Sequence, residues 1–230
     1  MKIDFHAHIL PRADHGCNSS AMAMAQLRLM QAAGTDAVVA TSHFYPNEDN
    51  ISSFLARREG CFEAMLQKLP MGELPTVYQG AEVLVCEGIH KMQGIERLAV
   101  VGTNVILLEM PFGHWRPELY NTVLEIRRLG LCPVLAHIDR YDMQQVNVLL
   151  EEGIQAQVNA EAYRPFAKTA PYEALMKEGL VVALGSDLHG DKPAAYNRFV
   201  KMQKKLGTLA DTVFAATEQL LKTATPLFKK

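Results

Sequence analysis

Short apolar runs alternate with longer amphipathic segments along most of this chain, and this alternation strongly limits its fold. Seven runs rich in Val, Ile, Leu and Ala have the length of strands, and segments of helical periodicity lie between them. Such an alternation is typical of a parallel sheet whose strands are joined by crossover helices. Residues 105–108 and 134–136 are apolar on both faces of a strand, which indicates burial on both sides of the sheet. The sequence therefore predicts an α/β fold with a closed or nearly closed barrel, with a doubly wound open sheet as the alternative.

The same pattern gives a position for each element. Strands are expected at residues 2–7, 37–43, 76–83, 104–109, 132–137, 154–159 and 181–187. Helices are expected at residues 19–33, 50–68, 117–129, 142–152, 170–178, 192–205 and 208–222. The chain has 230 residues, 49% of them hydrophobic, and no linker rich in Gly, Ser or Pro, so we expect one globular domain over residues 1–230.

Charge and cysteine usage exclude several classes of partner and site. The formal net charge of −2 and the pI near 6.4 give no general attraction to nucleic acid or anionic lipid. The N-terminus carries charges where a secretory signal needs apolar residues, and no run approaches the ~20 apolar residues that span a bilayer. We therefore expect a cytoplasmic protein with no membrane insertion and no nucleic-acid partner. The four cysteines form no C-x-x-C pair, so neither a disulfide framework nor a thiolate zinc site is expected.

Residue types that bind metals follow the apolar run in six of the predicted elements. These residues are His6 and His8, His43, Glu82, Glu109, His137, and Asp187 with His189. In a parallel barrel the carboxyl ends of the strands meet at one rim, where barrel enzymes place their active sites. Salt bridges could explain one or two buried carboxylates, but they do not explain six successive strand ends. The sequence therefore predicts a metal site at this rim.

The spacing and chemistry of these residues indicate more than one ion. Side chains two apart on an extended chain project to the same face, so His6 with His8 and Asp187 with His189 can each point inward together. Imidazole mixed with carboxylate suits Zn, Mn or Fe better than Ca or Mg. Because the ligands outnumber what one ion requires, we expect two or three divalent ions.

The motifs resemble those of the polymerase-and-histidinol-phosphatase (PHP) superfamily, whose first motif is His-x-His and whose last is Asp-x-His. More narrowly, the chain resembles the bacterial tyrosine-protein phosphatases of capsular and exopolysaccharide gene clusters. The motifs that carry this resemblance are His6-Ala7-His8-Ile9-Leu10-Pro11 with Asp14 and Gly16, Thr41-Ser42-His43, Gly80-Ala81-Glu82, Leu108-Glu109, His137-Ile138-Asp139-Arg140-Tyr141 and Ser186-Asp187-Leu188-His189. The resemblance implies a distorted TIM-like barrel with seven parallel-type strands, outer helices and a trinuclear metal centre.

The resemblance also implies how the ligands are distributed. One ion would take His6, His8, Glu82 and Asp187, a second would share Glu82 and add Glu109 and His137, and a third would take Asp14, His43 and His189. A metal-bridging hydroxide would be the nucleophile, with Glu82 and His137 at the reaction centre. Arg140 would supply positive charge beside it. Relatives also carry an Arg soon after the last motif, and the nearest basic residues at that place in this chain are Lys192 and Arg198.

Three further positions in the motifs bear on the site. His15 occupies a position where relatives commonly have a second acidic residue, so it is an extra ligand, a proton donor or a bystander. Ile138-Asp139 replaces the Pro-Glu of many relatives. Arg140 has no obvious acidic partner in the sequence except the adjacent Asp139, so we expect it to contact phosphate.

The resemblance implies a phosphoester hydrolase that dephosphorylates a tyrosine autokinase, at a phosphotyrosine of its tail, and so controls capsule or exopolysaccharide synthesis. No cysteine is followed six residues later by Arg, which removes the thiolate mechanism and leaves the metal route. A small-molecule phosphatase acting on a substrate such as histidinol phosphate is the alternative, and a proofreading nuclease is disfavoured by the lack of a basic composition. A non-catalytic metal-binding scaffold for a kinase is the alternative from another class.

Overall fold

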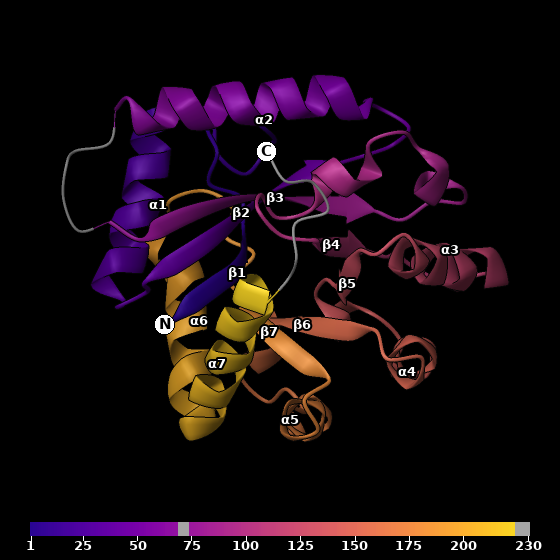
Figure 1. Cartoon of the computed structure of the whole chain (residues 1–230). Coiled ribbons are helices and arrows are strands. Elements are labelled where there is room, and N and C mark those ends of the chain that lie inside the picture. Colours follow the sequence, from indigo (N-terminus) through magenta and orange to yellow (C-terminus); the bar gives the residue numbers. More distant parts are fainter. Residues whose placement is uncertain (69–73, 224–230) are drawn as a thin grey trace.

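Seven parallel strands form the sheet of the computed structural model, which describes residues 1–68 and 74–223. Their order in the sheet is their order in the chain (Figure 1). The strands are β1 Ile3–Ala7, β2 Ala37–Phe44, β3 Thr76–Leu84, β4 Val105–Glu109, β5 Cys132–Leu135, β6 Gln155–Asn159 and β7 Val181–Gly185. All seven predicted strands are therefore present, each within two residues of its predicted bounds.

The first and last strands meet just beyond the end of β7. Ala7 forms a parallel bridge with Leu188, and the His8 amide donates to the Leu188 carbonyl at 3.1 Å. The Asp187 amide donates to the His6 carbonyl at 2.7 Å. These contacts nearly close the barrel, so the predicted barrel is confirmed and the open-sheet alternative is wrong.

Helices surround the strands on the outside of the barrel (Figure 1). They are α1 Ser20–Ala32, α2 Ile51–Leu66, α3 Pro117–Arg128, α4 Met143–Glu151, α5 Ala170–Lys177, α6 Pro193–Leu206 and α7 Thr208–Thr223. Side chains cap several of them, as the Asp142 carboxylate does when it accepts from the Gln144 amide at 2.8 Å. Proline opens α3 and α6 at positions where a helix needs no amide proton.

Short 3₁₀ helices and two early strand ends depart from the sequence prediction. The 3₁₀ helices are η1 Ile89–Lys91, η2 Ile95–Leu98, η3 Ile138–Arg140 and η4 Ala160–Tyr163, and single turns of this kind have no sequence periodicity to detect. β5 and β7 each end two residues before the predicted position. The reason is that His137 and Asp187 have φ values of 32° and 52°, a left-handed conformation that cannot continue a strand.

The inner side of the barrel changes character along each strand. Val39 and Leu107 belong to a small buried apolar cluster, against which residues of α7 pack. His43 and Glu109 lie an even number of residues further along the same strands, on the same face and closer to the carboxyl ends. The barrel is therefore apolar toward the amino ends of its strands and polar toward the carboxyl ends.

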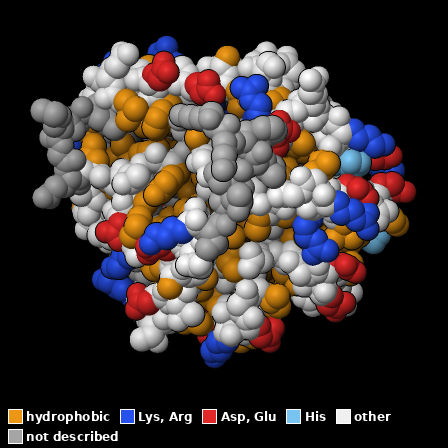
Figure 2. All heavy atoms as spheres, in the orientation of Figure 1, with side chains coloured by type: hydrophobic (Ala, Val, Ile, Leu, Met, Phe, Trp, Pro, Cys, Tyr) orange, Lys and Arg blue, Asp and Glu red, His pale blue; other side chains and the backbone are white. Residues whose placement is uncertain are grey.

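The helices and the surface differ from those of membrane-spanning and polyanion-binding proteins in two respects. Within residues 1–68 and 74–223, no helix is both long and apolar enough to span a bilayer. On the face shown in Figure 2, Lys and Arg side chains are interspersed with Asp and Glu. The described side chains visible on this face therefore form no broad basic surface.

Candidate metal centre

His6 and His8 at the end of β1 form the floor of a polar cluster. Both side chains are fully buried, and their Nε2 atoms lie 3.2 Å apart. The Nδ1 atom of His8 lies 2.7 Å from the Asp14 carboxylate, which fixes the ring with Nε2 turned toward the cluster. Burial alone would lower the pKa of His8, but the surrounding carboxylates, Asp14 first, raise it well above its ordinary value.

Two glycines allow these histidines to approach the neighbouring chain. A Cβ atom on Gly16 would lie 2.1 Å from the Cβ of His8, and one on Gly185 would lie 2.6 Å from the Cβ of His6. Both distances are too short for carbon atoms that are not bonded to each other. Both residues therefore have to be glycine if the two imidazoles are to keep their positions.

Glu82, at the end of β3, lies at the centre of the cluster. Its Oε1 atom is 2.6 Å from His137 Nε2. Its Oε2 atom is 3.0 Å from His43 Nδ1, 3.1 Å from His6 Nε2 and 3.3 Å from His8 Nε2. This oxygen is buried and has no hydrogen bond of good geometry with any of the three nitrogens. Although burial alone would raise the pKa of Glu82, the histidines around it, His6 first, hold it well below its ordinary range.

Glu109 and His137 form the side of the cluster that comes from β4 and β5. His137 Nε2 lies 3.8 Å from Glu109 Oε1, so Glu82 and Glu109 both approach this imidazole. Burial and then the charge of Glu82 raise the pKa of Glu109 to about 7. Burial likewise lowers the pKa of His137 and favours the neutral imidazole that binds metals.

Asp187 and His189 complete the cluster from the segment after β7. Asp187 Oδ1 lies 3.3 Å from His8 Nε2, 3.6 Å from His6 Nε2 and 3.4 Å from His189 Nδ1. The prediction that this pair lies on an extended strand is wrong, because the chain turns left-handed at Asp187. The turn nevertheless leaves both side chains at the rim.

The potential metal ligands form four groups of three residues, and within each group the three ligand atoms lie within 4.8 Å of one another. They are His8, His43 and His189; His6, His8 and Asp187; His6, Glu82 and His137; and His43, Glu82 and Glu109. Eight of the nine predicted ligands thus fall in these groups. Asp14 does not, because its oxygens accept from His8, from the Gly16 amide and from the His43 amide. The convergence of imidazole and carboxylate on shared points fits divalent Zn, Mn or Fe.

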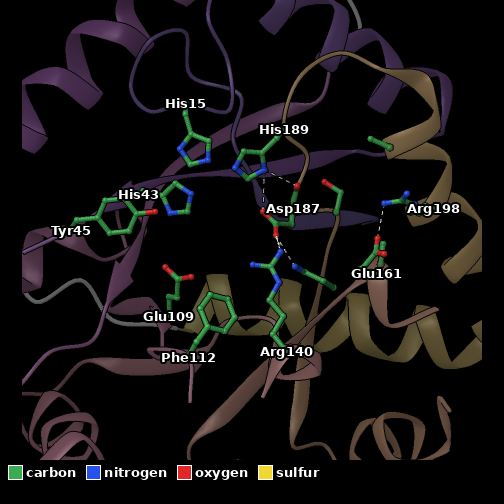
Figure 3. Close-up of a pocket in the computed structure, with 14 residues that line it drawn as sticks. His15, His43, Tyr45, Glu109, Phe112, Arg140, Glu161, Asp187, His189 and Arg198 are labelled. Carbon is green, nitrogen blue, oxygen red and sulfur yellow. Dashed lines mark hydrogen bonds and ion pairs between the residues drawn. The ribbon is translucent and has the colours of Figure 1, made fainter. Parts of the chain in front are cut away.

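A cavity of about 410 Å³ opens onto this cluster (Figure 3). Arg140 and Arg198 both line it, whereas Lys192 is not among its lining residues. Arg140 is hydrogen-bonded to the Asp187 carboxylate, so the expectation that only Asp139 could pair with it is wrong. Arg198 donates to Glu161 Oε2 at 2.6 Å at the edge of the cavity.

His15 also lies at the cavity. Its exposed ring stacks on His43 and on His189, with centroid distances of 4.9 Å and 4.8 Å. In Figure 3 the three imidazoles gather across from Arg140. His15 is therefore near enough to meet a ligand in the cavity, but it joins none of the four groups.

Two side-chain amides and a hydroxyl, none of them predicted from the sequence, hold this cluster in place. Gln157 Oε1 accepts from the His137 amide at 2.7 Å, and its Nε2 donates to Asn159 Oδ1 at 2.7 Å. Asn159 Nδ2 then donates to Asp187 Oδ2 at 3.0 Å. The Tyr141 hydroxyl lies 3.2 Å from His137 Nδ1. The alternation Gln155-Ala156-Gln157-Val158-Asn159 could have indicated polar side chains on the inner face of this strand.

A nearly closed parallel barrel with a cluster of imidazoles and carboxylates at the carboxyl ends of its strands defines the class of metal-dependent barrel enzymes. The model of one family, described as capsular polysaccharide synthesis, CpsB/CapC, matches residues 2–221. The chain belongs to this family, which confirms the resemblance drawn from the motifs.

Two relatives with known activities align with most of the chain. The tyrosine-protein phosphatase CpsB of Streptococcus pneumoniae is 28% identical over 209 residues, covering 81% of this chain and 82% of the relative. The tyrosine-protein phosphatase YwqE of Bacillus subtilis (strain 168) is 24% identical over 245 residues, covering 99% of this chain and 94% of the relative. The second alignment covers nearly the whole chain and therefore includes the motifs that supply the cluster.

A solved structure has the same fold. It comes from a crystallographic study of YwqE from Bacillus subtilis and CpsB from Streptococcus pneumoniae, described as unique metal-dependent tyrosine phosphatases. The TM-score is 0.77 at 22% sequence identity, with 99% of this chain and 100% of that chain covered. The predicted seven-stranded, distorted TIM-like barrel is therefore confirmed.

Proposed function

We propose that this chain is a metal-dependent phosphatase that removes phosphate from phosphotyrosine in a protein. The observation that carries the proposal is the position of Glu82, whose two oxygens face four imidazoles from β1, β2 and β5 within 3.3 Å. A carboxylate has two oxygens and can bridge two ions, which no single imidazole can do. Family membership and the activities of the two aligned relatives support the same assignment.

The proposed centre holds two or three divalent ions of Mn, Fe or Zn. Their ligands are His6, His8, Asp14, His43, Glu82, Glu109, His137, Asp187 and His189. Bound ions of this kind lower the pKa of water to roughly 7 and neutralise charge on a phosphoryl group. Eight of these residues contribute to the clusters of converging ligand atoms, and the Asp14 carboxylate lies beside them, 2.7 Å from His8 Nδ1.

Other residues of the chain bind and orient the substrate. Arg140 reaches the cavity next to Asp187 and carries a fixed positive charge, which suits the developing charge on phosphoryl oxygens. Arg198 lines the same cavity from α6 and would contact phosphate after exchanging its partner Glu161. Tyr141 holds His137 with its Nε2 atom directed at Glu82.

Phosphotyrosine is the favoured ester because of its leaving group and because of the relatives. A phenolate, with a pKa of about 10, departs with less need for protonation than an alkoxide. Burial raises the pKa of all four thiols, to about 11 for Cys17, which disfavours a thiolate nucleophile. The proposed protein substrate is the tail of a tyrosine autokinase that controls capsule or exopolysaccharide synthesis.

The test is an assay of the metal-stripped protein reloaded separately with Mn, Zn, Fe or Mg. Each form is offered a phosphotyrosine peptide, histidinol phosphate and single-stranded DNA. We expect metal-restored hydrolysis of the phosphotyrosine peptide, with a pH midpoint that moves when the metal is changed. Preferential hydrolysis of histidinol phosphate would make the chain a small-molecule phosphatase, and no hydrolysis with any metal would overturn the enzymatic proposal.

A further inference from the structure

Phe112 is a large apolar side chain that the fold leaves outside its core. It lies three residues after the end of β4, lines the cavity and is 74% exposed. Five of the seven other Phe side chains that the structure describes are buried, and Phe44, Phe54 and Phe199 are completely so. Exposing an aromatic ring to water is unfavourable in free energy. An exposed ring at the wall of a polar cavity therefore suggests that a ligand covers it.

The loop that carries Phe112 is held on both sides of the exposed ring. The Pro111 carbonyl accepts from the buried Trp115 indole at 2.9 Å, and the Gly113 carbonyl accepts from Gln145 Nε2 at 3.1 Å. The Trp115 amide in turn donates to Gln145 Oε1 at 2.6 Å. The backbone therefore presents the ring in a defined place, and its exposure is not that of a free loop tip.

The same loop is connected to the proposed catalytic centre. The Met110 amide donates to the Tyr141 hydroxyl at 3.0 Å, and the rings of Phe112 and Tyr141 lie 6.4 Å apart. Figure 3 shows Phe112 beside Glu109, with Tyr45 on the same side of the cavity and Arg198 on the other. A phosphate held near Arg140 and the cluster would thus place its ester group within reach of the Phe112 ring.

We propose that Phe112 contacts the aromatic ring of an aryl phosphate and selects aryl over alkyl esters at this site. The inference rests on the proposed phosphatase function and names a residue that determines its substrate. Two aromatic rings gain from offset or edge-to-face packing beyond the area they bury. A serine ester offers one methylene where tyrosine offers a ring, so it has nothing that packs against Phe112.

The test compares Phe112→Ala with the wild-type enzyme and with Phe166→Ala. Phe166 is a matched control, because it is also exposed but does not line the cavity. Each metal-loaded protein is assayed on two peptides that differ only in carrying phosphotyrosine or phosphoserine. Phenylphosphonate and methylphosphonate, which are not hydrolysed, are titrated by calorimetry to measure binding directly.

We expect Phe112→Ala to lower kcat/KM for the phosphotyrosine peptide by roughly three- to tenfold and to weaken the binding of phenylphosphonate by the same factor. Its affinity for methylphosphonate should be unchanged. Phe166→Ala should match the wild-type enzyme in all these measurements, and Phe112→Trp should retain the preference for aryl esters. Equal losses on both phosphonates, or no loss on either, would overturn the role of Phe112. If the wild-type enzyme hydrolyses neither peptide, the proposed function fails, while the ratio of the phosphonate affinities still tests Phe112.

Discussion

The Tyr141 hydroxyl connects two parts of the centre, so Tyr141→Phe is an informative change of a single atom. The hydroxyl oxygen accepts from the Met110 amide at 3.0 Å and lies 3.2 Å from His137 Nδ1. Burial, and then the charge of Glu109, raise the pKa of Tyr141, so the phenol stays protonated. If His137 binds metal through Nε2, its Nδ1 atom carries the proton, and the tyrosine oxygen is the acceptor that keeps this tautomer in place.

Removing the hydroxyl has two separable effects. Met110 is fully buried, and its amide would lose its acceptor, which costs about 1–3 kcal/mol of unfolding free energy. The ring of Tyr141 still packs edge-on against Trp115 with a centroid distance of 5.1 Å, so little packing is lost. Loss of such a supporting hydrogen bond to a metal-binding histidine typically costs about 10–100-fold in metal affinity.

The matched control is Tyr163→Phe. The Tyr163 hydroxyl is buried and has no hydrogen-bond partner within residues 1–68 and 74–223, and the Lys205 ammonium lies 5.2 Å from the centre of a ring that phenylalanine retains. Denaturant unfolding of the metal-free proteins gives the stability effect, and competition with a chelator of known affinity gives the metal effect. We expect Tyr141→Phe to lower both the unfolding free energy and the metal affinity, and Tyr163→Phe to lower neither. Equal metal affinities for wild-type and Tyr141→Phe would refute the role of the hydroxyl in orienting His137.

Four further predictions address the centre and its surroundings. Glu82→Gln should lose metal and activity together, and full metal occupancy by elemental analysis with retained turnover would contradict a bridging role. Arg140→Ala should lower kcat/KM by about a hundredfold or more while metal content and melting temperature stay intact; a collapse of the melting temperature would instead indicate a structural role. Gly185→Ala should cost about 1–3 kcal/mol in denaturant unfolding, because the new Cβ would lie 2.5 Å from Gln157 Nε2 and 2.6 Å from the Cβ of His6. Chelation should abolish turnover and alkylation with iodoacetamide should spare it, whereas the opposite result would contradict the use of metal.

The positions of the strands and the identity of the strand-end residues could be predicted from the sequence for the same reason. Most strands contain a short apolar run, and a residue type that binds metals stands at or just after its end, as Glu109 does in β4. The supporting contacts could not be predicted, because they depend on which strands become neighbours. Arg140 and Asp187 are 47 residues apart, and their pairing appears only when the barrel brings β5 and β7 to one rim. Gln157 is an uncharged amide, and its sequence context does not show that it faces the His137 backbone.

The strained backbone at the ends of β5 and β7 explains both the misplaced strand ends and the geometry of the centre. Among residues 1–68 and 74–223, His137 and Asp187 are two of four non-glycine residues with positive φ, a conformation that costs of order 1–3 kcal/mol each. Each is fixed by a hydrogen bond from its own amide, to Gln157 Oε1 and to the His6 carbonyl, both at 2.7 Å. A strand that continued to these residues would alternate its side chains between the two faces, whereas the left-handed turn sets each ligand at the rim. The neighbouring strands therefore stabilise a conformation that the local sequence disfavours, and they hold His137 and Asp187 at the rim.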